Sequence, residues 1–284
     1  MADHIPPLSQ TPFFAEALRA CGQFPLMKNG ILHLQRRLFG MPLTMISRAH
    51  FDSSSVLESL PSGPIVLAPD HPTPWLTGTG ALPLMTPASV AELDLTLTEQ
   101  QLTSQQHQKW RNRLRKAQTA QLRVQHTPMP DTPNHWLYLA DHSAQRHKGY
   151  RAWPLPLTQA FVRLGPKRSR LFTAYENSTA IAAMLFLRHG KVATYHIGQT
   201  TDRGRALNAH TLLLWQATQW LRAQGHSRLD LGLIDTRASP GLARFKLGSG
   251  ATSRPLGGTW LYMPRLGPLL RPLARWDHNL MQST

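Results

Sequence analysis

The chain has 284 residues, with 31 lysines and arginines against 15 aspartates and glutamates, and a formal net charge of +16. Its single cysteine, Cys21, excludes an intramolecular disulfide framework and a cysteine-based zinc cluster. No run approaches the roughly 18 apolar residues of a membrane span, and no signal peptide is visible at the first residues, so we expect a soluble cytoplasmic protein without stable membrane insertion.

The positive charge is unevenly distributed along the chain. Residues 1–94 carry 5 basic and 7 acidic side chains, whereas residues 95–284 carry 26 and 8, a net charge of +18. An excess of this size favours a phosphate-bearing ligand or a polyanionic partner for the C-terminal two-thirds. Arginine outnumbers lysine 24 to 7, a skew that codon bias in a GC-rich genome also produces.

The first 97 residues predict few regular elements. We expect a short helix at 12–21, a buried strand at 65–68 and a loop rich in proline, glycine and threonine at 69–87. A strand is expected at 90–97, where apolar and polar residues alternate.

From residue 98 the elements follow closely. A helix at 98–119 places Trp110, Leu114 and Ala117 on one apolar stripe, and a long helix at 206–223 is apolar on most sides. The pattern also predicts helices at 134–148, 156–164 and 242–246, and strands at 122–125, 170–175, 181–188, 192–197, 228–233 and 257–263. This order indicates an α/β (α+β) layer on a mixed, largely antiparallel sheet flanked by helices.

Several chemical motifs are missing. The sequence has no Walker A loop, no H-E-x-x-H, no G-x-S-x-G and no dinucleotide-binding fingerprint. His142 and His147 are five residues apart and do not share a helix face well, so we expect no metal site. The lone Cys21 has no neighbours that would activate a nucleophilic thiol.

Three features between residues 90 and 263 together carry a family resemblance. They are a basic helix from Arg111 to Ala117 ahead of a strand, a strand–helix–glycine–strand unit from Ala193 to Gly232, and the run "GL-x-x-FK-x-x-x-G" from Gly241 to Gly250. The chain resembles the GNAT-fold acyltransferases, and most closely their Fem-like branch of peptidoglycan-bridge aminoacyltransferases and BioF2-like acetyltransferases. The resemblance implies a degenerate N-terminal GNAT-like half at 1–97, an acyltransferase domain at 98–263 and a surface tail at 264–284.

The same resemblance implies an activity. An N-acyltransferase of this kind moves an acyl group, expected to be acetyl, from acyl-CoA to an amine by direct attack, and needs no metal. CoA-dependent members carry Q/R-x-x-G-x-G/A between strand and helix, whereas this slot reads Arg203 to Asn208 without the glycine spacing. Either Arg203 and Arg205 meet the donor phosphates, or the donor is aminoacyl-tRNA, as in Fem-like relatives.

Roles are expected for individual residues, for Lys246 from the resemblance and for most others from their place in the predicted elements. Lys246, of the Phe-Lys pair, would lie near the reacting acyl group; the alternative is a surface lysine. Tyr195 and His196, both expected among the catalytic residues, end a strand. Alternation predicts that one faces the core and the other the cleft, with His196 as base or as a hydrogen-bonded core residue. Expected donor-binding residues are Arg203, Arg205, Asn208, His210, Arg244 and Phe245, and expected substrate-binding residues are Asp235 and Arg237.

Some alternatives stay open at this level. The cluster of Arg111, Arg113, Arg115 and Lys116 is either a solvated helix face or a polyanion surface, and the aromatic residues Trp75, Tyr150 and Trp153 line an acceptor pocket or simply pack. A non-catalytic nucleic-acid-binding protein and a degenerate GNAT scaffold are the rival classes, although no recognised nucleic-acid motif is present. The sequence does not predict an oligomeric state or the identity of the amine.

Overall fold

The computed structural model describes residues 5–38, 40–149, 152–266 and 269–272, which fall into two compact units. The first unit joins residues 1–89 to 255–284, and the second spans 90–254. These limits differ from the expected segments 1–97, 98–263 and 264–284. The difference arises because β6 (Ser89–Asp94) belongs to the sheet of the second unit and β13 (Thr259–Tyr262) to the sheet of the first.

The first unit is built on a six-stranded sheet. Its strand order is β1-β2-β3-β4-β13-β5, with β3 and β4 parallel, and its core includes Ile46, Ile65, Leu67 and Leu76. The strands are β1 (Pro25–Lys28), β2 (Ile31–Leu38), β3 (Met41–Ala49), β4 (Ile65–Pro69) and β5 (Leu82–Met85), with helix α1 (Pro12–Ala20) and the short 3-10 helices η1 (Leu8–Gln10), η2 (Ser54–Ser59) and η3 (Pro74–Thr79).

The second unit is built on a seven-stranded sheet in the order β12-β6-β11-β10-β9-β8-β7. Strands β7 to β10 pair antiparallel in sequence, and β10 pairs with β11 in parallel. The expected mixed, largely antiparallel sheet is thereby confirmed. Its remaining strands are β7 (Arg123–Thr127), β8 (Ser169–Glu176), β9 (Thr179–His189), β10 (Val192–Thr200), β11 (Arg228–Ile234) and β12 (Thr252–Pro255).

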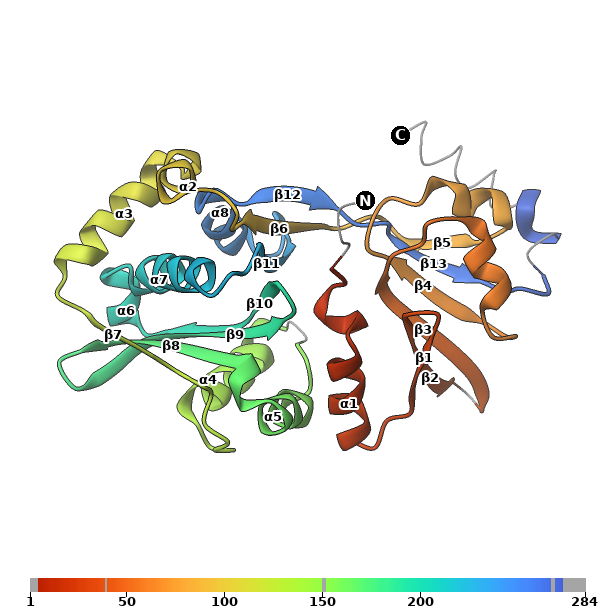
Figure 1. Ribbon diagram of the computed structural model, residues 1–284, viewed down its shortest axis with the longest axis horizontal. Coiled ribbons are helices and arrows are strands. Elements are labelled where there is room, and N and C mark those ends of the chain that lie inside the picture. The colour runs from red at the N-terminus through yellow and green to blue at the C-terminus, as the bar shows by residue number, and fades with distance from the viewer. Residues whose placement is uncertain (1–4, 39, 150–151, 267–268, 273–284) are drawn as a thin grey trace. The chain divides into compact units, whose positions relative to one another are not determined.

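Helices cover both faces of this sheet. Figure 1 shows α3 and α7 on one face, and α4 and α5 on the other. The stripe of Trp110, Leu114 and Ala117 on α3 is buried, as predicted. The helices are α2 (Glu99–Gln105), α3 (Gln108–Thr119), α4 (Trp136–Lys148), α5 (Leu155–Leu164), η4 (Pro166–Arg168), α6 (Asp202–Ala206), α7 (Ala209–Ala223) and α8 (Pro240–Gly248).

Two predicted helices are interrupted. The helix expected at 98–119 is wrong as one element, because the backbone leaves helical geometry at Gln106 and the N–H of His107 donates to the carbonyl of Gly248 instead. The helix expected at 206–223 starts at Ala209, since Asn208 takes a left-handed conformation with φ 54° that ends α6 before α7 begins.

The early chain is richer in structure than predicted. Strands β1, β2 and β3 occupy a region for which no strand was predicted, and the expected loop at 69–87 contains η3 and β5. Across the described part of the chain, none of the helices has the length and apolar character needed to cross a membrane.

Candidate functional site

Strands β10 and β11 define a cleft in the second unit. They pair in parallel only at the start, through Val192 with Arg228, Ala193 with Leu229 and Thr194 with Asp230, although both continue for several residues. Beyond Thr194 the residues of both strands line an open cavity of about 1060 Å³. Elements α4, α7 and α8 contribute further walls.

A β-bulge interrupts β10 where the strand borders this cleft. In the pairing of β10 with β9, Tyr195 faces Phe186 and Ile197 faces Leu185, which leaves His196 as the extra residue. A bulge breaks the alternation of side chains, and both Tyr195 and His196 are among the residues that border the cleft. Tyr195 additionally packs against Phe186, with ring centroids 5.7 Å apart.

Lys246 enters the cleft from α8. Its side chain is 5% exposed, and its Nζ donates a 2.7 Å hydrogen bond to the carbonyl oxygen of Leu233 at the end of β11. Gly232, with φ 76°, leaves room beside the amine, since a Cβ there would lie 3.8 Å from Nζ. Burial lowers the pKa of Lys246 to about 8, against the partly opposing charge of Asp230. A lysine in this setting is still largely protonated at pH 7.

His196 is held by a neighbouring helix. Its Nε2 lies 2.8 Å from the hydroxyl oxygen of Thr158 on α5, and its ring lies 4.7 Å from the ring of Trp153. Burial lowers the pKa of His196 to about 4, while the negative charge of Asp141 acts in the opposite direction. The imidazole is therefore neutral at pH 7, in a fixed orientation on the cleft wall.

His210 connects α7 to the bulged strand. Its Nε2 lies 2.9 Å from the carbonyl oxygen of Gln199 and must be the donor, because a carbonyl only accepts. Burial lowers the pKa of His210. The residue lines the cleft and at the same time fixes the start of α7 against β10.

The two arginines of α6 have different surroundings. Arg203 makes a two-pronged ion pair with Glu176 and does not line the cleft. Arg205 lines the cleft; it donates to the carbonyl of Thr200 at 3.1 Å and contacts Asp202. Of this pair, the structure brings only Arg205 to the same cavity as Lys246.

The remaining candidates divide in the same way. Asp235 lines the cleft, and its Oδ1 accepts hydrogen bonds from the backbone N–H groups of Arg237 and Ala238, which shapes the loop after β11. Four other candidates lie outside the lining: Asn208 at the start of α7, Phe245 packed against the core, and the exposed Arg237 and Arg244.

Sequence reasoning missed several residues of the cleft. Asp141 and Gln199 both line it, and the side-chain amide of Gln199 donates to Asp141 at 3.1 Å. Thr158, which holds His196, is buried on α5. Asp141 could have been found from the sequence, because it is an acidic residue on the otherwise apolar face of α4 that includes Leu137.

The other sequence candidates are scattered. Trp75 belongs to the first unit, and Tyr150 lies outside the described residues. Arg111 donates to the carbonyl of Gln106 at 3.0 Å and so closes the end of α2. Arg113 and Lys116 are exposed on α3. The tail at 264–284 is described only at 264–266 and 269–272.

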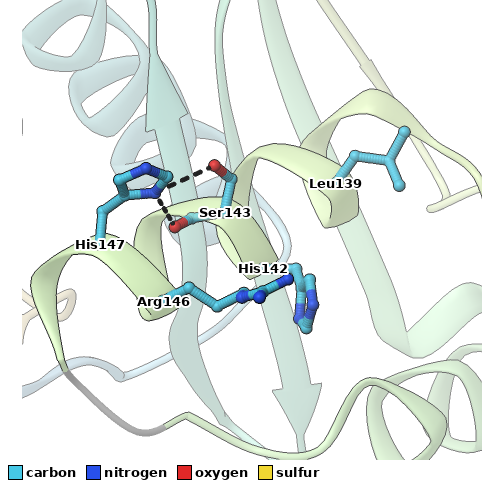
Figure 2. A pocket seen from close by; sticks show the side chains of 5 residues that line it. All are labelled: Leu139, His142, Ser143, Arg146 and His147. Atoms are coloured by element: carbon cyan, nitrogen blue, oxygen red, sulfur yellow. Dashed lines mark hydrogen bonds between the residues drawn. The ribbon is translucent and has the colours of Figure 1, made fainter.

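The histidines of α4 do not converge. Figure 2 shows His147 turned to Ser143, with its Nδ1 2.8 Å from the Ser143 carbonyl oxygen, while His142 lies beside Arg146 and points away from His147. The hollow that these side chains border is formed by successive turns of one helix. Among the described residues, no group of three or more histidine, cysteine, aspartate or glutamate side chains is placed to hold a metal ion.

The geometry agrees with one protein family. Residues 104–247, about half of the chain, match the family model described as an acetyltransferase (GNAT) domain, and the chain therefore belongs to the GNAT acetyltransferase family. No match is found among curated proteins.

Solved structures share the fold of the whole chain. A crystal structure of FemX is 12% identical, covers 94% of each chain and has a TM-score of 0.73. The C-terminal domain of a putative lysylphosphatidylglycerol synthetase from Agrobacterium fabrum is 12% identical, with 95% of this chain and 91% of that chain covered and a TM-score of 0.55. L-PGS from Bacillus licheniformis is 11% identical, with 95% and 96% covered and a TM-score of 0.54. The chain thus shares its fold, with two mostly antiparallel sheets, with these structures.

Proposed function

We propose that the protein is an N-acyltransferase that moves an acyl group, acetyl in the simplest case, from acyl-CoA to an amine by direct attack. The observation that carries the proposal is the parting of β10 and β11, which opens a cavity lined by both Lys246 and His196. Such a cleft accelerates transfer mainly by holding the thioester and the amine together in the right orientation. We place the reaction in the cytoplasm, a reducing compartment that suits a lone cysteine.

The chemical step assigns separate tasks to these two residues. The neutral amine attacks the thioester carbonyl carbon, the C–N bond forms, and the carbon–sulfur bond breaks as the thiolate leaves. His196, unprotonated at pH 7, accepts the proton that the amine loses. The ammonium group of Lys246 stabilises the negative charge on the carbonyl oxygen of the tetrahedral intermediate.

Tyr195 and Gly198 support this geometry. A Cβ on Gly198 would lie 2.0 Å from the Tyr195 hydroxyl oxygen, so the glycine allows the phenol to remain over the strand. A phenol in this position can donate to the leaving thiolate. Arg205 contributes a positive charge for the donor phosphates from the α6 side of the cleft, with His210 and Asp235 bounding the same cavity.

Aminoacyl-tRNA is the second candidate donor. It is favoured by the missing glycine-spaced phosphate loop, whose place is taken by α6, with the Arg203 side chain bound to Glu176. The net charge of +18 over residues 95–284 also suits a polyanionic donor. The same chemistry applies, with an ester oxygen as the leaving atom.

Two measurements on the full chain separate the candidates. Isothermal titration with acetyl-CoA tests the first donor, and a pull-down with charged tRNA, repeated over a salt series, tests the second. Acetyl-CoA binding followed by acetylation of an amine supports the proposal. Salt-dependent RNA binding without any transfer would favour a nucleic-acid-binding protein, and no binding in either assay would favour a scaffold.

A further inference from the structure

A second cavity adjoins the cleft on the side of α4 and α5. It has a volume of about 450 Å³ and is bordered by α4, by the start of α5, by residues 152–154 and by Ile197. Three residues, Asp141, Ala152 and Ile197, line both this chamber and the cleft. The two spaces therefore share a wall, and the chamber lies next to the bulged strand that carries His196.

The chamber differs from the cleft in chemical character. Its walls are largely apolar, with Leu139, Trp153, Pro154, Leu155 and Pro156 among the lining residues. The ring of Trp153 lies 4.7 Å from the ring of His196. A flat or branched apolar group seated against this indole would therefore lie close to the residue that accepts a proton.

Asp141 is the acidic residue at the shared wall. Its side chain is buried, with the residue 7% exposed, and its two oxygens are held separately: Oδ2 accepts from the amide of Gln145 at 2.7 Å and Oδ1 from the amide of Gln199 at 3.1 Å. Each carboxylate oxygen has two lone pairs and can accept from an ammonium group as well as from an amide. The two glutamines thus orient a negative charge at the wall that the chamber and the cleft share.

We infer that this chamber is the acceptor subsite and takes a primary amine carrying an apolar alkyl or aryl group, whose ammonium form is bound by Asp141 and loses one proton to solvent before the neutral amine attacks. The role of the chamber as an acceptor site rests on the proposed transferase function. Binding of the amine in the chamber does not depend on that function, so amine binding and acyl transfer can be tested separately. The chamber accounts for the apolar part of the ligand and Asp141 for its charge, so an amine without the apolar group and a neutral ligand without the amine should both bind weakly.

The first test uses the full chain without any acyl donor. Intrinsic tryptophan fluorescence is titrated with 2-phenylethylamine, with methylamine and with the uncharged 2-phenylethanol, and Trp153→Phe identifies the part of the signal that comes from the chamber. We expect 2-phenylethylamine to bind at least about tenfold more tightly than either control ligand, and Asp141→Asn to remove about tenfold of that affinity without changing the alcohol. Asp52→Asn, at an exposed aspartate of the first unit, is the matched control.

Two results would overturn the inference. One is equal affinity for 2-phenylethylamine and methylamine, and the other is a folded Asp141→Asn protein, judged by far-ultraviolet circular dichroism, that binds 2-phenylethylamine as the wild type does. Should Asp141→Asn fail to fold, Leu155→Trp replaces it: filling the chamber should raise the dissociation constant of 2-phenylethylamine at least about tenfold, and an unchanged value would equally overturn the inference.

Transfer assays then distinguish the two proposals. If 2-phenylethylamine binds more tightly than methylamine but no acetyl group is transferred from acetyl-CoA, the chamber is supported as a binding site and the enzymatic function is contradicted. Transfer to methylamine and 2-phenylethylamine with equal KM, in both wild type and Asp141→Asn, would support the function and overturn the subsite.

Discussion

The buried amine of Lys246 predicts a specific dependence of stability on pH. Its pKa falls from the ordinary 10.5 to about 8 in the folded protein, because α8 and β11 remove it from water. A shift of about 2.5 units corresponds to about 3 kcal/mol, at about 1.4 kcal/mol per unit. Below pH 8 the folded and unfolded chains both hold the Lys246 proton, so the folded state carries the full free-energy cost of burying a charged amine.

The sign of the effect follows from proton binding. Between pH 8 and 10.5 the folded chain has lost the Lys246 proton while the unfolded chain still holds it, so the free energy of unfolding rises with pH. Replacement by methionine, which has no ionisable group, should remove this rise. The wild type should gain up to about 3 kcal/mol relative to Lys246→Met over that interval.

Urea denaturation followed by tryptophan fluorescence at several pH values from 7 to 10.5 measures the difference. Lys191→Met, at an exposed lysine in the turn before β10, is the matched control and should keep the wild-type pH dependence. Identical pH dependence of the free energy of unfolding in wild type and Lys246→Met would refute the reasoning, since it would mean that Lys246 keeps an ordinary pKa in the folded chain.

Three further predictions concern packing, donor binding and an internal ion pair. Gly204→Ala should lower the free energy of unfolding by about 1–3 kcal/mol in urea denaturation, because the new Cβ would lie 2.3 Å from the Ile181 carbonyl oxygen. Arg205→Ala should weaken acetyl-CoA binding about tenfold in isothermal titration, whereas Arg203→Ala should leave the dissociation constant within about twofold; equal losses would contradict the assignment. Glu92→Gln should cost about 3 kcal/mol in the same denaturation assay, because the nearly buried carboxylate receives two hydrogen bonds from one arginine and lies 3.8 Å from another.

Periodicity predicted the second unit far better than the first. The stripe of Trp110 on α3 and the strands β8 to β11 have clear apolar patterns, since both faces of that sheet are covered by helices. Strand β2, in contrast, contains Arg36 and Arg37 in a partly exposed sheet, and its polar run does not alternate. Its pairing with β1 and β3 depends on tertiary contacts that the local sequence pattern does not encode.

The candidate site was predictable where a motif carried it. Lys246 was singled out from the Phe-Lys pair, and it does line the cleft. The bulge at His196 leaves no mark in the sequence, because it depends on the register of β10 against β9. The docking of α4 brings Asp141 to Gln199, and the docking of α5 brings Thr158 to His196; both are tertiary arrangements rather than local patterns.

The central claim, that the cleft between β10 and β11 is the site of acyl transfer, is tested most directly by Lys246→Ala in an acetyl-transfer assay. Mass spectrometry of an amine incubated with acetyl-CoA should show transfer reduced roughly 100- to 1,000-fold relative to the wild type, with circular dichroism confirming that the variant is folded. Full transfer activity in a folded Lys246→Ala protein would contradict the claim.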